Sequence, residues 1–99
     1  MTYKIILENR AITDSKTAYN YYELIQVGLG DRFMRALEGR INSIRLNPKL
    51  FRKIKDEIRQ VSLKKFPFVI IYEIFEDIVI VYAIFHTSRN PDSKFTDGE

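Results

Sequence analysis

The sequence predicts an α+β fold: an N-terminal strand, an antiparallel helical hairpin, and three further strands that complete a mostly antiparallel four-stranded sheet. Two observations carry this prediction. Before Pro48, apolar residues recur every three or four positions, which is the period of an amphipathic helix. After Ile58 they recur every second position, which is the period of a strand. Helices that precede the strands as a group are typical of an architecture in which they cover one face of the sheet.

The short apolar run at residues 3–7 is the expected first strand. A helix follows, because four apolar residues then recur at i, i+3, i+4 and i+7. Asn9 or Thr13 is a candidate cap for its start, and Asp14 suits the positive end of its dipole. The apolar stripe consists of Ala18, Tyr21, Tyr22 and Ile25.

The segment Gly28-Leu29-Gly30 ends this helix, and Gly28 or Gly30 is available for a left-handed C-cap. A second apolar stripe begins directly afterwards, so the two helices should form an antiparallel hairpin. Asn47-Pro48 ends the second helix, because proline disfavours helical geometry in the residue before it. The second stripe consists of Phe33, Leu37, Ile41 and Ile44.

Two apolar strands near the C-terminal end are joined by the tight turn Glu76-Asp77. Pro67 precedes the first of them, where its missing N–H does least harm. The second, residues 78–85, is apolar on both faces and should lie inside the sheet. With helices on one side only, the other face of the sheet is open to a ligand or partner. In the first strand, one face carries Phe68, Ile70, Tyr72 and Ile74, and the other carries Val69, Ile71, Glu73 and Phe75.

Composition limits the function classes. The 99 residues are enough for one domain over 1–99, with a loosely held polar tail after about residue 91. Without cysteine and with one histidine, neither a disulfide framework nor a metal site is expected, and no motif for a cofactor is present. The longest apolar run, residues 78–85, has eight residues, whereas a membrane helix needs about 20. No signal peptide is recognisable, so we expect a soluble, cytoplasmic protein.

The candidate site residues are cations that flank the two apolar strands. His86 and Arg89 follow the strands; together they could hold a phosphate and His86 could transfer a proton, but a histidine at a strand end is also often structural. Arg59, Lys64 and Lys65 precede the strands and suit an RNA backbone, although lysines there could equally keep a sheet edge soluble.

The apolar face of the same region suggests a protein partner. Val69 and Ile71 should form an exposed patch with a basic border, which suits an acidic amphipathic peptide. Glu73 shares their face and needs a partner there, for which Lys64, Arg59 or Arg89 are candidates. Tyr72 projects from the opposite face and should pack in the core.

Several short motifs follow one another along the chain: Tyr21-Tyr22-Glu23 with Gly28-Leu29-Gly30 and Phe33, Asn47-Pro48 with Phe51, Ile58-Arg59, Lys65-Phe66-Pro67-Phe68, Ile71-Tyr72-Glu73, and His86-x-x-Arg89-x-Pro91. In this order, the chain resembles the RelE/ParE superfamily of toxins from bacterial toxin–antitoxin pairs over essentially its whole length. It departs from the pattern at Phe68, where tyrosine is common, and at Lys94-Phe95, where relatives often carry tryptophan.

The resemblance implies a toxin that is neutralised by a cognate antitoxin, in a homodimer or a toxin–antitoxin hetero-oligomer. The superfamily divides by mechanism. One branch consists of ribosome-dependent endoribonucleases that cut mRNA with the 2′-hydroxyl as nucleophile, and here His86 and Arg89 would be catalytic. The other branch resembles ParE, which inhibits DNA gyrase by protein–protein contact and catalyses no reaction.

The pattern favours the ParE branch. Nuclease relatives often carry arginine three residues before the central-strand tyrosine, where this chain has Val69. Loss of one transition-state cation can cost a factor of about 10²–10³ in rate. A degenerate toxin and a basic nucleic-acid-binding domain are further alternatives. The residues expected to bind RNA or a partner protein are Arg59, Lys64, Lys65, Val69, Ile71, Glu73 and Lys94.

Overall fold

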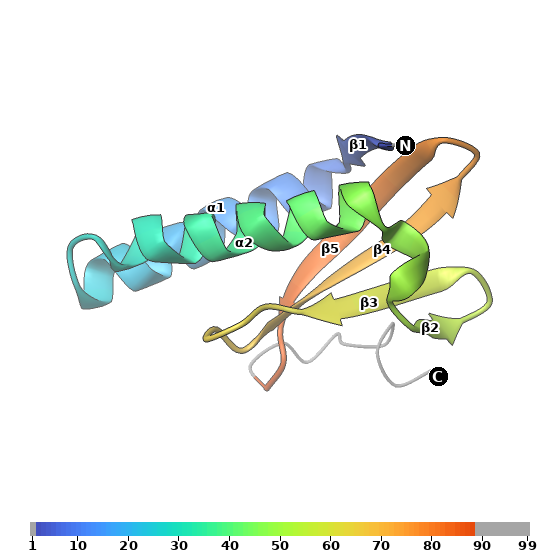
Figure 1. Ribbon diagram of the computed structural model, residues 1–99. Coiled ribbons are helices and arrows are strands. Elements are labelled where there is room, and N and C mark those ends of the chain that lie inside the picture. The colour runs from blue at the N-terminus through green and yellow to red at the C-terminus, as the bar shows by residue number, and fades with distance from the viewer. Residues whose placement is uncertain (1, 89–99) are drawn as a thin grey trace.

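The predicted α+β architecture is confirmed by a computed structural model that describes residues 2–88 of the chain (Figure 1). The two helices lie side by side across one face of a mixed sheet, and the free end of their hairpin extends beyond the strands. The elements are β1 (Lys4–Leu7), α1 (Asn9–Ile25), α2 (Leu29–Leu46), the 3₁₀ turn η1 (Pro48–Leu50), β2 (Lys53–Lys55), β3 (Ile58–Ser62), β4 (Phe68–Phe75) and β5 (Ile78–His86).

The sheet has five strands in the order β1-β5-β4-β3-β2, one more than the four predicted. β1 pairs with β5 in parallel, and the remaining neighbours are antiparallel. The additional strand, β2, has only three residues, Lys-Ile-Lys, and is too short for a recognisable period. β5 lies between β1 and β4, as expected for an interior strand.

The start of α1 differs from the prediction. Its N-cap is Glu8, so neither Asn9 nor Thr13 caps it. Asp14 lies in the second turn, where its carboxylate accepts a hydrogen bond from the backbone N–H of Ile84 at 2.9 Å. Asp14 also lies 3.6 Å from the guanidinium of Arg10. Its role is therefore to tie α1 to β5.

The turn between the helices depends on glycine and on one carboxylate. Gly28 is left-handed (φ 92°) as predicted, but it is the N-cap of α2, whereas Gln26 is the C-cap of α1. The Oε1 atom of Glu23 accepts hydrogen bonds from the N–H groups of Gly28 (2.9 Å) and Gly30 (2.8 Å). Because the first N–H groups of a helix have no partner within it, this carboxylate stabilises the start of α2.

The main core lies between the helices and the sheet. Phe33 and Ile44 of α2 are fully buried there, as is Tyr72 of β4. The hydroxyl group of Tyr72 donates to the carbonyl oxygen of Pro48 at 2.6 Å, so the buried phenol is satisfied. The expected role of Tyr72 in core packing is confirmed.

A β-bulge explains why β5 does not alternate cleanly. Ile71 pairs with Ala83 and Tyr72 pairs with Val81, which leaves Tyr82 as an additional residue on β5. Val81 therefore faces the helices, whereas Ala83 faces the opposite side. Because residues on both faces of β5 pack in an apolar cluster, the sequence of this strand is apolar without interruption.

The face opposite the helices is not the exposed apolar patch that the alternation predicted. Val69 is 4% exposed and Ile71 is fully buried. They form a second cluster with Ala83 and Phe85, against which Ile54, Ile58 and Tyr82 pack. The prediction was wrong because alternation shows which face a side chain occupies but not what packs over it.

Candidate functional site

The loop between β3 and β4 is held firmly against the helical hairpin. Phe66 lies in this loop, and its ring centroid is 5.1 Å from that of Tyr22 and 5.5 Å from that of Phe33. At the loop's start, the Nε atom of Arg40 donates to the carbonyl oxygen of Ser62 at 2.8 Å. The position of the adjacent Lys64 and Lys65 backbone is therefore set by packing.

Between this loop and α2 lies a surface hollow of about 570 Å³, which we call the basic hollow. It combines four cationic side chains with a partly buried apolar floor. Arg32 and Arg35 were not predicted as site residues, although their spacing of three places them on the same side of a helix. The lining residues are Leu29, Arg32, Arg35, Ala36, Lys64, Lys65 and Phe66.

Arg59 does not share this hollow. It pairs with Tyr72 across β3 and β4, and one of its terminal nitrogens donates to the carbonyl oxygens of Phe51 (2.6 Å) and Lys49 (3.3 Å). Burial raises the pKa of Tyr72 to about 12, with the charge of Arg59 acting in the opposite direction. Arg59 therefore fixes the η1 segment against the sheet.

His86 lies at the end of β5, opposite Phe68 of β4. The two rings pack edge to face, with centroids 5.1 Å apart. The Nδ1 atom of His86 accepts a hydrogen bond from the backbone N–H of Ser88 at 3.1 Å. An imidazole that accepts at Nδ1 carries no proton on that nitrogen. Arg89, predicted to act together with His86, and Lys94, predicted to bind RNA or a partner protein, lie outside the described residues.

Glu73 is bound differently from expectation. Its Oε1 atom accepts a hydrogen bond from the hydroxyl group of Tyr82 at 2.8 Å. This hydrogen bond, together with burial, raises the pKa of Tyr82. The bulge in β5 brings Tyr82 to this face, so the structure pairs Glu73 with a phenol rather than with Lys64 or Arg59.

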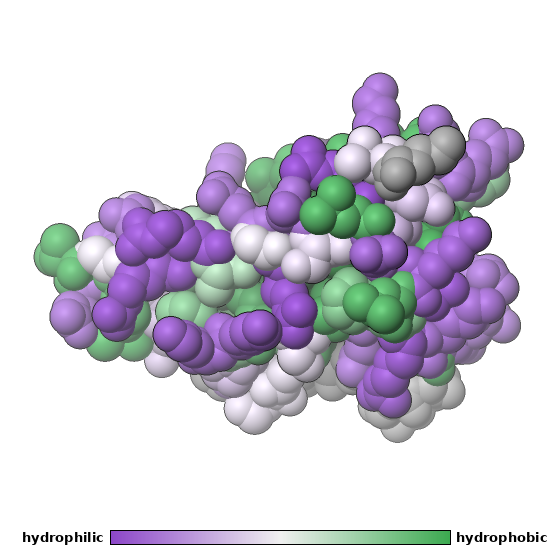
Figure 2. Space-filling view, viewed as in Figure 1, coloured by the Kyte–Doolittle hydropathy of each residue, from purple (hydrophilic) through white to green (hydrophobic). Residues whose placement is uncertain are grey.

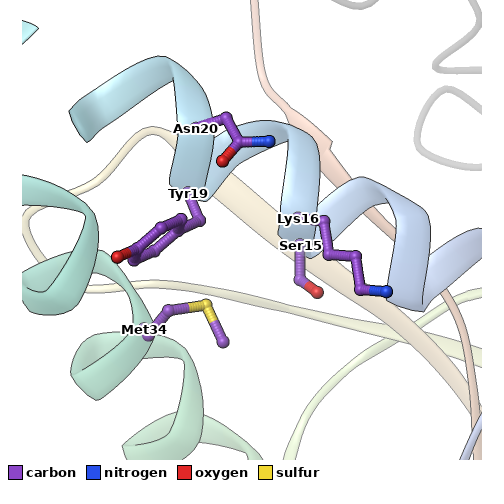
Figure 3. A pocket seen from close by; sticks show the side chains of 5 residues that line it. All are labelled: Ser15, Lys16, Tyr19, Asn20 and Met34. Atoms are coloured by element: carbon purple, nitrogen blue, oxygen red, sulfur yellow. The ribbon is translucent and has the colours of Figure 1, made fainter. Parts of the chain in front are cut away.

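A smaller hollow of about 380 Å³ lies in the seam of the hairpin and was not predicted. Figure 3 shows Tyr19 of α1 pointing toward Met34 of α2, with Ser15, Lys16 and Asn20 along α1. The negative charges of Asp31 and Glu23 raise the pKa of Tyr19. Most of the surface that lines this hollow is apolar.

The free end of the hairpin exposes apolar side chains. Leu24 and Val27 are each 89% exposed and Ile25 is 57% exposed. We call these three residues the hairpin tip. Figure 2 shows hydrophobic residues at this end, beside hydrophilic side chains along the helices. Apolar groups gathered at one exposed end are typical of a protein-binding surface.

Comparison with known proteins identifies the family. The profile described as "ParE toxin of type II toxin-antitoxin system, parDE" matches residues 5–91. The chain belongs to the ParE toxin family. The predicted resemblance is thus confirmed on the ParE side, and the protein is a ParE-like toxin of the type II toxin–antitoxin class.

A solved structure supports the same fold. A chain described as "Chromosomal ParDE TA system from P. aeruginosa" is similar to this one, with a TM-score of 0.77 and 12% sequence identity. The match covers 88% of this chain and 98% of that chain. No curated protein sequence matches this chain significantly. Among the described residues, 2–88, no helix is both long and apolar enough to cross a membrane.

Proposed function

We propose that this ParE-family protein is the toxin of a type II toxin–antitoxin pair and inhibits DNA gyrase by protein–protein contact, without catalysing a reaction. The separation of the predicted RNA-binding groups supports this proposal. Arg59 binds main-chain carbonyls near η1, whereas Lys64 and Lys65 border the basic hollow on the helix side. Val69, at the position where nuclease relatives often carry arginine, is buried in the second cluster.

The proposal includes a cognate antitoxin and a cytoplasmic site of action. A toxin that arrests growth needs a neutralising partner in the same cell, and the similar P. aeruginosa chain comes from a ParDE system. We expect residues 1–99 to act as one domain and to co-purify with the product of an adjacent gene. A chain whose overexpression is harmless and which has no such neighbour would contradict the toxin role.

Induction of the toxin in a growing culture, followed by two measurements, tests the mechanism. We expect plasmid topoisomers to show loss of negative supercoiling while primer extension shows intact mRNA. Rapid codon-phased mRNA cleavage with normal supercoiling would instead establish the alternative, a RelE-like mRNA endoribonuclease. If neither effect appeared but the antitoxin still bound, the chain would be a degenerate toxin.

Two variants sharpen this test. His86→Gln should leave gyrase inhibition nearly unchanged, because no proton moves in a binding mechanism. In an endoribonuclease, His86→Gln and Arg89→Ala should each abolish cleavage while ribosome binding persists, because general acid–base catalysis contributes about 10²–10⁴ in rate. The roles of Arg89 and Lys94 in partner binding remain predictions for the same assay.

A further inference from the structure

The basic hollow is formed by two separate segments of the chain, unlike the charged face of a single helix. Its cations come from two segments far apart in sequence, Arg32 and Arg35 from α2 and Lys64 and Lys65 from the β3–β4 loop. All four side chains are exposed, whereas Phe66 beside them is partly buried against the hairpin. The charges are therefore held around a common depression.

Two carboxylates of the hairpin near the hollow, Glu23 and Asp31, act on groups outside it. Glu23 binds the N–H groups of Gly28 and Gly30 at the turn. Asp31 lies close enough to Tyr19 for its negative charge to raise the pKa of that phenol, and Tyr19 lines the separate hollow in the seam of the hairpin. Neither of these carboxylates is among the residues that line the basic hollow, so the field there is positive.

Apolar surface adjoins these cations. Leu29, Ala36 and Phe66 form the floor of the hollow. Leu29 begins α2 only two residues after Val27, so the floor leads toward the exposed hairpin tip. A ligand that matches this surface must combine negative charge with apolar side chains. A nucleic acid backbone supplies the charge but not aliphatic groups for the tip.

We propose that the basic hollow and the hairpin tip together bind an acidic amphipathic segment of a partner protein. This inference deepens the proposed function, on which it rests, by assigning the partner to the helix side of the molecule instead of the buried Val69–Ile71 face. Carboxylates of the segment pair with Arg32, Arg35 and the two lysines, and its apolar side chains cover the floor and tip. Arginine is well suited here because its guanidinium holds carboxylates bidentately.

Fluorescence anisotropy with labelled synthetic peptides tests the surface directly. The probe is a helical peptide of leucine and glutamate with the leucines on one face. Two comparison peptides replace either glutamate by lysine or leucine by serine. The protein should bind the first peptide at least about 10-fold more tightly than either comparison peptide at low salt. Equal binding of all three peptides would overturn the proposal.

Matched charge reversals locate the binding. Arg32→Glu combined with Arg35→Glu should weaken binding of the acidic peptide by about 10-fold or more, mainly through slower association. Arg52→Glu combined with Lys55→Glu makes the same change of charge at exposed positions near β2 and should alter it less than about 2-fold. Equal losses in both double variants would refute the assignment to the hollow.

A variant with a less apolar hairpin tip and one competitor complete the experiment. Leu24→Ser combined with Val27→Ser removes apolar groups that are already exposed, so the fold is retained while peptide affinity falls several-fold. A short RNA that binds the hollow more tightly than the peptide would also overturn the proposal. Growth arrest on induction is scored separately, so failure of peptide binding is distinguishable from failure of the toxin function.

Discussion

Tyr72→Phe tests how the core joins η1 to the sheet. The substitution keeps the ring but removes the hydroxyl group that donates to the carbonyl oxygen of Pro48 at 2.6 Å. Tyr72 is fully buried, so the carbonyl loses its partner in a site that excludes water. The free energy of unfolding should fall by about 1–2 kcal/mol at neutral pH.

The contribution of Tyr72 to the free energy of unfolding should also depend on pH. Burial raises the pKa of Tyr72 from 10.0 to about 12 in the folded protein, so the neutral phenol favours folding. This contribution is fully present below pH 10 and is lost as the pH rises toward about 12. The loss is about 1 kcal/mol at pH 11 and approaches about 3 kcal/mol above pH 12.

The assay is urea unfolding of the wild-type protein and of Tyr72→Phe at a series of pH values from neutral to about 11. Other tyrosines and the lysines titrate in both proteins, so the difference between them isolates Tyr72. The wild type should be more stable at neutral pH, and the difference should shrink to near zero by about pH 11. Equal stability at neutral pH, or a difference that does not change with pH, would show that the Tyr72 hydroxyl group does not stabilise the fold in this way.

Three further substitutions test individual contacts. Glu23→Ala removes the acceptor of two N–H groups at the start of α2 and should lower the free energy of unfolding by about 1–2 kcal/mol. Backbone amides in the first turn of α2 should also exchange faster with solvent, and an unchanged exchange rate would contradict that role. Arg59→Ala should lower the free energy of unfolding in urea by about 1–3 kcal/mol, because two carbonyl oxygens lose their donor. The control Lys55→Ala, at an exposed position, should lower it by less than about 0.5 kcal/mol. Equal losses in the two variants would indicate that the Arg59 side chain is solvated. Gly30→Ala places a methyl group 2.8 Å from the backbone oxygen of Tyr19 and should lower thermal stability by about 1–3 kcal/mol, so a fully stable variant would show that the helices can separate freely.

Local periodicity was sufficient to predict the helices and the long strands. The apolar residues before Pro48 recur with a helical period, and β4 and β5 are long apolar runs with a short acidic turn between them. β2 could not be predicted because three residues with one apolar side chain form no pattern. The bulge at Tyr82 was also hidden, since a change of face in β5 resembles a strand that is apolar on both sides.

The candidate site was predicted less well because its geometry depends on register and packing. Arg59 lies opposite Tyr72, and only that pairing shows that its side chain faces the helices. Lys64 and Lys65 approach Arg32 and Arg35 because Phe66 packs into the aromatic cluster of the hairpin. The sequence identifies Lys64 and Lys65 as candidate residues, but it does not show that they share a surface with Arg32 and Arg35.

A supercoiling assay with purified components measures whether the toxin inhibits gyrase by binding alone. Relaxed plasmid, DNA gyrase and ATP are mixed with the wild-type toxin or with His86→Gln. We predict that both proteins block the introduction of supercoils at similar concentrations. Undiminished gyrase activity in the presence of a toxin that cleaves mRNA on purified ribosomes, with cleavage lost in His86→Gln, would contradict the account.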